Sequence, residues 1–142
     1  MTEKILLVDD EQDFLDALSE RMRARGMDVA TSSSAQDALA TAEKGNFDAV
    51  VLDLKMPGMD GLEALRILKE KDPKLQVILL TGHATVQQGV EAMKRGALDL
   101  LEKPTDIETL TEKIKQASAQ HMLLVSQEAE DKMKDILASK GW

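Results

Sequence analysis

Five side chains that could act together on a phosphoryl group stand directly after, or within two residues of, short apolar runs of the sequence. Three are carboxylates, one is a hydroxyl and one is an ammonium: Asp9, Asp10, Asp53, Thr81 and Lys103. Clustered carboxylates repel one another unless a cation intervenes, and a hard dication such as Mg²⁺ suits carboxylate, water and phosphate oxygens. A carboxylate beside such an ion can act as a nucleophile and form an aspartyl phosphate. The residue types therefore predict magnesium-assisted phosphoryl transfer, with the lysine pairing with a phosphate oxygen.

These side chains can meet only if the runs before them lie in one sheet. Five runs, most of them rich in Val, Ile and Leu, are typical of short strands covered on both faces. They are Ile5–Val8, Met27–Ala30, Ala49–Leu52, Val77–Leu80 and Ala97–Leu101. An amphipathic stretch with helical spacing follows each run. Gly26, Gly45 and Pro73 end the first three of these helices, the fourth covers about Thr85 to Arg95, and the fifth begins near Asp106.

The alternation of strand and helix occurs five times over about Lys4–Ala119. This pattern predicts an α/β fold, a doubly wound parallel (βα)5 sheet of the flavodoxin-like type. Five strands fit the order 2-1-3-4-5 better than the six-strand dinucleotide-binding order. Because ligands bind where the carboxyl ends of the first and third strands lie together, Asp9, Asp10 and Asp53 are expected to converge there.

Composition excludes several other classes of protein. The 142 residues correspond to about one domain, and the absence of cysteine together with only two histidines, His83 and His121, excludes thiol chemistry and a multi-histidine metal site. The net charge of −8 and the three aromatic residues, Phe14, Phe47 and Trp142, argue against direct nucleic-acid binding. No apolar run approaches the roughly 20 residues of a membrane span. We therefore expect a cytoplasmic protein without a membrane partner.

Four stretches of the sequence, one at each of four strand ends, together resemble the response-regulator receiver domain of two-component signalling. They are KILLVDDE, VVLDLKMPGMDG, LLTGHA and LEKP. The resemblance implies a phosphoacceptor switch, not a turnover enzyme, with only slow self-phosphorylation and self-dephosphorylation. It also implies Mg²⁺, a sensor histidine kinase or phosphotransfer protein as donor, and an unknown downstream protein that contacts the surface around the fourth and fifth helices.

Carried over residue by residue, the resemblance implies that Asp53 is the phosphoacceptor. Asp9 and Asp10 look like the acidic pair, with Asp10 a direct metal ligand and Asp9 acting largely through water. Asp53 and the backbone carbonyl of Lys55 would complete the protein's share of the metal shell. The side chain of Lys55 would lie beside the phosphoryl group and influence its lifetime.

Other positions at the strand ends follow the same resemblance, with one departure. Thr81 looks like the hydroxyl that moves to bond the phosphoryl group, and Lys103 like the phosphate-contacting lysine before a cis bond to Pro104. His83 looks like a residue that affects phosphoryl lifetime. The family usually has Tyr, Phe or His three residues before the lysine, and here that position is Leu100. With Leu100 at this position, phosphorylation is still expected to occur, while the output switch is altered or carried by other residues.

Two other functions fit parts of the pattern. A magnesium phosphatase with an aspartate nucleophile needs a second aspartate two residues after it as general acid, and Lys55 occupies that position. A flavodoxin-like cofactor binder needs a phosphate-binding loop rich in Ser, Thr or Gly after the first strand. The acidic residues 9–13 would repel a phosphate there. Both alternatives are therefore disfavoured.

The resemblance divides the chain into a receiver domain, residues 1–119, and a helical tail, residues 120–142. One apolar stripe extends through the fifth helix to Leu124 and then fades, and a second stripe begins one position out of phase. The second stripe is Met122, Val125, Ala129, Met133 and Ile136. The helix either breaks near residue 120 or continues and faces a different partner. The tail either folds on its own domain or pairs with the tail of a second copy to form a homodimer. The surface of the fourth and fifth helices is an alternative dimer interface. The chain is either a stand-alone receiver or a piece of a longer regulator.

Overall fold

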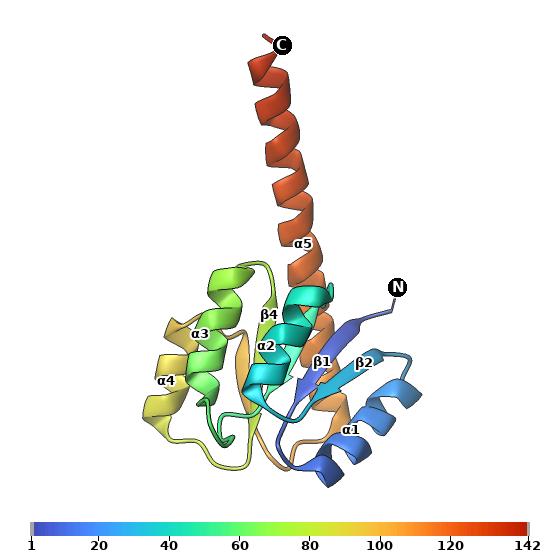
Figure 1. The fold of residues 1–142 in the computed structure, drawn as a ribbon. Helices are drawn as coiled ribbons and strands as arrows, with labels where there is room; N and C mark the ends of the chain where they lie inside the picture. Colours follow the sequence, from blue (N-terminus) through green and yellow to red (C-terminus); the bar gives the residue numbers. More distant parts are fainter. Residues whose placement is uncertain (1, 142) are drawn as a thin grey trace.

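The computed structural model describes residues 2–141 and forms one parallel sheet between two layers of helices (Figure 1). The strand order is β2-β1-β3-β4-β5, which confirms the predicted α/β flavodoxin-like fold. The strands are β1 (Lys4–Val8), β2 (Asp28–Ser32), β3 (Ala49–Leu52), β4 (Gln76–Thr81) and β5 (Asp99–Glu102). The helices are α1 (Gln12–Ala24), α2 (Ala35–Lys44), α3 (Gly61–Lys71), α4 (Val86–Lys94) and α5 (Ile107–Ser139). Met1 and Trp142, the outer limits of the two predicted units, lie outside the described residues.

Two hydrophobic cores cover the two faces of the sheet. Alternate side chains of a strand point to opposite faces, so Ile5 and Leu7 of β1 enter one core while Leu6 and Val8 enter the other. Helices α1 and α5 cover the first core, and helices α2, α3 and α4 cover the second. The central strands β1, β3 and β4 are buried almost throughout and appear in the sequence as mainly apolar runs, whereas the edge strands β2 and β5 are only partly buried.

Only β3 has the bounds of its predicted apolar run: β1 begins one residue earlier, β4 is one residue longer at each end, and the other two strands are displaced. The second strand is Asp28–Ser32 and the fifth is Asp99–Glu102, both displaced toward the C-terminus of the predicted runs. Strand limits follow hydrogen-bonded pairing, and β1 pairs with β2 from Lys4 opposite Asp28 to Val8 opposite Ser32. Apolar runs report burial instead, so polar residues at the strand ends are missed.

Four helices begin at polar residues whose side chains accept a hydrogen bond from the first turn, a common stabilisation of helix starts. These N-caps are Ser34 for α2, Asp60 for α3, Thr85 for α4 and Asp106 for α5. Thr85 and Asp106 lie where the sequence predicted the fourth and fifth helices to begin. The caps fix where the loops after β2, β3, β4 and β5 end, and these loops lie at the edge of the sheet that carries the carboxylates.

Helix α5 is continuous and much longer than its contact with the domain. Its first part buries Ile107, Leu110 and Ile114 against the sheet. The helix does not break near residue 120, and its C-terminal part extends away from the domain (Figure 1). Exposed apolar side chains follow along this part: Met122, Leu123, Val125, Met133, Ile136 and Leu137. Over residues 2–141, no helix is both long and apolar enough to cross a membrane.

Candidate phosphoacceptor and metal site

Pairing of β1 with β3 places two of the predicted carboxylates beside each other. Val8, the last residue of β1, lies opposite Leu52, the last residue of β3. The backbone N–H of Asp53 donates to the carbonyl of Val8 over 3.1 Å, and that of Asp9 donates to the carbonyl of Ser32 over 3.1 Å. The chain directly after both strands is thus held by the sheet, so Asp9 and Asp53 stand at one edge.

Asp9, Asp10 and Asp53 form a carboxylate cluster. Each offers one oxygen, and these oxygens lie within 4.8 Å of one another. Asp9 and Asp53 are buried, with 1% and 5% of their surface exposed, whereas Asp10 is exposed. Oxygen donors at this spacing fit a hard dication such as Mg²⁺, which retains water and exchangeable ligands on its open side. The exposed Asp10 gives the cluster that open side.

Lys103 reaches the carboxylate cluster from the loop after β5. Its Nζ lies 2.6 Å from Oδ2 of Asp9 and 3.5 Å from Oδ2 of Asp53. Burial alone would lower the pKa of Lys103, but the hydrogen bond to Asp9 and the charges of Asp53 and Asp9 outweigh it and raise this pKa. The side chain is therefore an ammonium at neutral pH. The bond from Lys103 to Pro104 is cis, as the resemblance implied.

Backbone donors hold the other oxygen of each buried carboxylate. Oδ1 of Asp9 accepts a hydrogen bond from the N–H of Glu11 over 2.9 Å, and Oδ1 of Asp53 accepts one from the N–H of Lys55 over 3.2 Å. Each carboxylate thus has one oxygen fixed by its own loop and one directed to Lys103. Lys55 contacts Asp53 through its N–H here, and the metal-binding role of its carbonyl stays a prediction.

Thr81 stands buried at the end of β4, on the same edge of the sheet. Its carbonyl accepts a 2.7 Å hydrogen bond from the N–H of Lys103, which joins the ends of β4 and β5. Its hydroxyl donates to the carbonyl of His83 over 3.4 Å. The structure therefore brings the backbone of Thr81 to Lys103, while its hydroxyl bonds within its own loop. The roles of Thr81 and His83 toward a phosphoryl group stay predictions.

Two residues that sequence reasoning does not assign to the site shape it. The ring of Phe14, on α1, lies under Lys103, with Nζ 4.0 Å from the ring centroid. Gly61 packs against the loop after β3 so closely that an added Cβ would lie 2.6 Å from the carbonyl oxygen of Asp53. Helical spacing places Phe14 on the apolar face of the first helix, and the glycine after Asp60 is an ordinary turn signal, so neither residue is distinctive in sequence.

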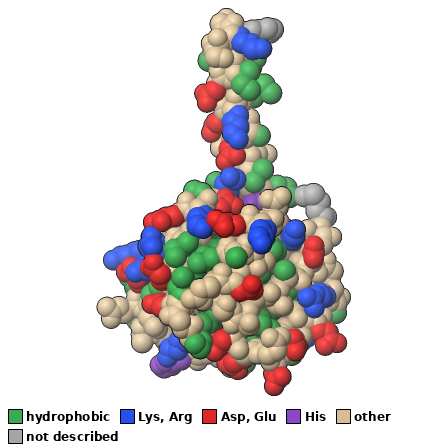
Figure 2. Space-filling model, in the orientation of Figure 1, with side chains coloured by type: hydrophobic (Ala, Val, Ile, Leu, Met, Phe, Trp, Pro, Cys, Tyr) green, Lys and Arg blue, Asp and Glu red, His purple; other side chains and the backbone are tan. Residues whose placement is uncertain are grey.

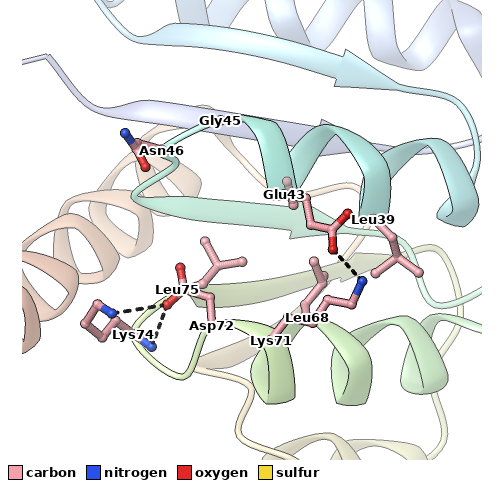
Figure 3. Close-up of a pocket in the computed structure, with 10 residues that line it drawn as sticks. Leu39, Glu43, Gly45, Asn46, Leu68, Lys71, Asp72, Lys74 and Leu75 are labelled. Carbon is pink, nitrogen blue, oxygen red and sulfur yellow. Dashed lines mark hydrogen bonds and ion pairs between the residues drawn. The ribbon is translucent and has the colours of Figure 1, made fainter.

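A cavity of about 460 Å³ lies at the other end of the sheet, between α2 and α3 (Figure 3). Its lining includes Asn46 and Leu75, which precede β3 and β4, and the ion pair between Lys71 and Glu43 lies at its side. No residue of the carboxylate cluster lines it. The cavity is therefore separate from the carboxylate cluster.

The doubly wound sheet with acidic residues at its switch point defines a class of ligand-binding α/β domain. A family model described as "Response regulator receiver domain" matches residues 5–115. The chain belongs to the response-regulator receiver domain family, and it is the receiver part of a two-component phosphorelay. The resemblance read from the four sequence stretches is thus confirmed.

Particular relatives agree with this assignment. The chain is 42% identical over 115 residues to the C4-dicarboxylate transport transcriptional regulatory protein DctD of Pseudomonas aeruginosa, covering 80% of this chain and 25% of that one. It is 37% identical over 116 residues to the transcriptional regulatory protein FixJ of Bradyrhizobium diazoefficiens, covering 82% and 57%. A receiver domain structure from Clostridium thermocellum matches with a TM-score of 0.82 and 35% identity, covering 86% and 98%. The chain spans about a quarter of the length of the first curated relatives it matches.

Proposed function

We propose that this receiver domain accepts a phosphoryl group on Asp53 from a sensor histidine kinase or phosphotransfer protein, in a reaction that requires Mg²⁺. The observation that carries the proposal is the carboxylate cluster with Lys103 beside it: three oxygens within 4.8 Å and an ammonium that contacts both Asp9 and Asp53. Phosphoryl transfer depends mainly on positioning and on neutralising charge, and these residues supply both.

The proposed step is a direct displacement at phosphorus. Oδ2 of Asp53 attacks the phosphorus of a phosphohistidine. The new O–P bond forms as the P–N bond breaks, and the electron pair of the broken P–N bond stays on the imidazole nitrogen. Mg²⁺ held by Asp9, Asp10, Asp53 and the Lys55 carbonyl would supply charge neutralisation for the phosphoryl oxygens. Lys103 pairs with one of those oxygens, because its Nζ already lies beside Oδ2 of Asp53. The Thr81 hydroxyl leaves its hydrogen bond within its own loop and donates to another of the phosphoryl oxygens.

The aspartyl phosphate then shifts the equilibrium between two conformations of the α4 and α5 surface, which contacts a downstream protein. On α4, Val86, Val90 and Met93 are exposed at intervals of four and three residues, an apolar stripe suited to a protein partner. With a net charge of −8, the chain itself is not expected to bind nucleic acid. A cytoplasmic location belongs to the same proposal.

Labelling with a small phosphodonor tests the assignment of Asp53. Wild-type protein is incubated with radiolabelled acetyl phosphate, with Mg²⁺ or with EDTA, beside Asp53→Asn and a matched Asp28→Asn control on the exposed start of β2. We expect Mg²⁺-dependent labelling of the wild type and of Asp28→Asn, and none of Asp53→Asn. Undiminished labelling of Asp53→Asn would refute the assignment. Rapid, steady hydrolysis of a phosphate ester would instead favour the phosphatase alternative.

A further inference from the structure

We propose that Phe14 is a positioning residue for Lys103, whose ammonium it holds beside Asp53 against the face of its aromatic ring. The inference rests on the proposed phosphoryl transfer to Asp53 and adds a residue to that site. The lysine Nζ lies 4.0 Å from the ring centroid, well within the roughly 6 Å over which a cation is attracted to an aromatic face.

The surroundings of both side chains strengthen this contact. Phe14 is partly buried and packs against the core between α1, α5 and the sheet, so its ring is held by neighbouring side chains. Only 16% of the Lys103 side chain is exposed, which limits the water that would compete for the ammonium. Phe14 lies in the first turn of α1, directly after the loop that carries Asp9 and Asp10. The ring is therefore positioned by the same segment that positions the acidic pair.

The ring of Phe14 gives Lys103 an attraction that does not depend on cation binding or on phosphorylation, unlike the attraction of its two carboxylate partners. Asp9 and Asp53 are also the oxygen donors for a dication, so a bound cation weakens their attraction for the ammonium. Phosphorylation of Asp53 changes the second partner chemically. The neutral ring of Phe14 takes part in neither event. It keeps Lys103 over the site in each state, where Nζ can meet an incoming phosphoryl oxygen.

A series of fluorinated phenylalanines at position 14 tests the attraction itself. Fluorine withdraws negative charge from the ring face while largely preserving its shape and apolar character. From phenylalanine through 4-fluoro- to 3,4,5-trifluorophenylalanine, we expect a stepwise fall in the rate of Asp53 labelling by acetyl phosphate, to a total of about two- to fivefold. The same series at Phe47, whose ring lies 5.3 Å from Nζ of Lys4 and far from Asp53 in the fold, should leave the rate unchanged.

A charge-free background separates positioning from packing. In Lys103→Met, fluorination at position 14 should no longer alter the labelling rate, because no ammonium remains to be attracted. An unchanged rate in the wild-type background, or an equal fall in Lys103→Met, would overturn the proposal. Phe14→Trp should retain labelling at near the wild-type rate, whereas Phe14→Leu should lower it; equal rates in these two variants would also count against a role for the ring.

A measurement without any phosphodonor keeps this inference distinct from the proposed function. Protons above an aromatic ring are shifted upfield, so the ε-methylene protons of Lys103 should show that shift in the NMR spectrum of the wild type. The shift should vanish in Phe14→Leu and remain in Phe14→Trp. If the wild type shows this shift but is not labelled at Asp53, the proposed function fails. If the wild type is labelled but shows no such shift, the role of Phe14 fails.

Discussion

Nζ of Lys103 lies 2.6 Å from Oδ2 of Asp9, a contact between residues 94 positions apart in the chain. It joins the loop after β5 to the loop after β1, across the carboxyl edge of the sheet. The ammonium neutralises part of the charge of the carboxylate cluster, and a dication bound to the same oxygens would do likewise. Lys103 and Mg²⁺ are therefore expected to compete for Asp9.

Replacing Lys103 with methionine should reveal this competition. Without the ammonium, the three carboxylates repel one another, and we expect the free energy of unfolding in EDTA to fall by about 1–3 kcal/mol. The Mg²⁺ affinity should rise by about three- to tenfold, because a positive charge beside the cation has been removed. Calorimetric titration with MgCl₂ and urea unfolding measure the two effects.

Lys113→Met is the matched control for that variant. Lys113 pairs with Asp99 over 2.8 Å, but this pair lies on the surface between β5 and α5, apart from the carboxylate cluster. It should leave the Mg²⁺ affinity unchanged. Weaker Mg²⁺ binding by Lys103→Met than by wild type would show that the lysine supports the cation instead of competing with it.

The same contact predicts a pH dependence of stability. The pKa of Lys103 is raised in the folded chain, so its ion pair contributes stability that is fully present below the ordinary lysine pKa. This contribution is lost as the pH rises through the raised folded value. In EDTA, the difference in unfolding free energy between wild type and Lys103→Met should stay constant from pH 7 to 9 and shrink above about pH 10.5. A difference that grows with alkaline pH would contradict the raised pKa.

Leu100 provides a third prediction, because it stands where the family usually has an aromatic residue. A Cβ added to Gly89 of α4 would lie only 3.3 Å from Cδ2 of Leu100, so this leucine already contacts the backbone of α4 closely. In a Leu100→Ala background, Gly89→Ala should stabilise the fold by about 0.5–1 kcal/mol through helix propensity. In the wild type, that gain should be cancelled or reversed by the crowded contact. Urea unfolding of the wild type, the two single variants and the double variant gives the coupling energy between positions 89 and 100 directly. Equal effects of Gly89→Ala in both backgrounds would exclude this coupling.

The carboxylate cluster was predictable because Asp9 and Asp53 directly follow apolar strands, and the carboxyl ends of parallel strands share one edge. The contact of Phe14 with Lys103 was not predictable, since it depends on where the first turn of α1 lies relative to the loop after β5. Helical spacing identifies an apolar face but not the side chain that this face meets. The sequence does not decide whether α5 is continuous, because its two apolar stripes are out of phase by one position. The structure resolves it in favour of one helix, and no glycine or proline occurs between Ala119 and Ser139 to interrupt it.

The exposed apolar side chains at the end of α5 lead to the last prediction, which concerns assembly (Figure 2). Within the described residues after Ala119, two polar contacts join the helix to the domain: His121 to Asp48 over 3.1 Å, and Lys74 to Glu128 over 2.9 Å. Beyond them Met133 and Ile136 are 56% and 50% exposed, and on the domain Val90 of α4 is 50% exposed.

We expect the C-terminal part of α5 to pair with the same part of a second copy. Solvent exposure of its apolar side chains is unfavourable, and helix pairing buries them. Light scattering with the phosphate mimic beryllofluoride should give a dimer mass for wild type and a monomer mass for the double variant Met133→Gln, Ile136→Gln. The free energy of monomer unfolding should change by less than about 0.5 kcal/mol in the double variant, since neither side chain packs on its own domain. Val90→Gln tests the other candidate face. A dimer that survives the tail substitutions but dissociates with Val90→Gln would place the contact on α4, and a monomer mass for the wild type would remove the tail as a dimerisation element.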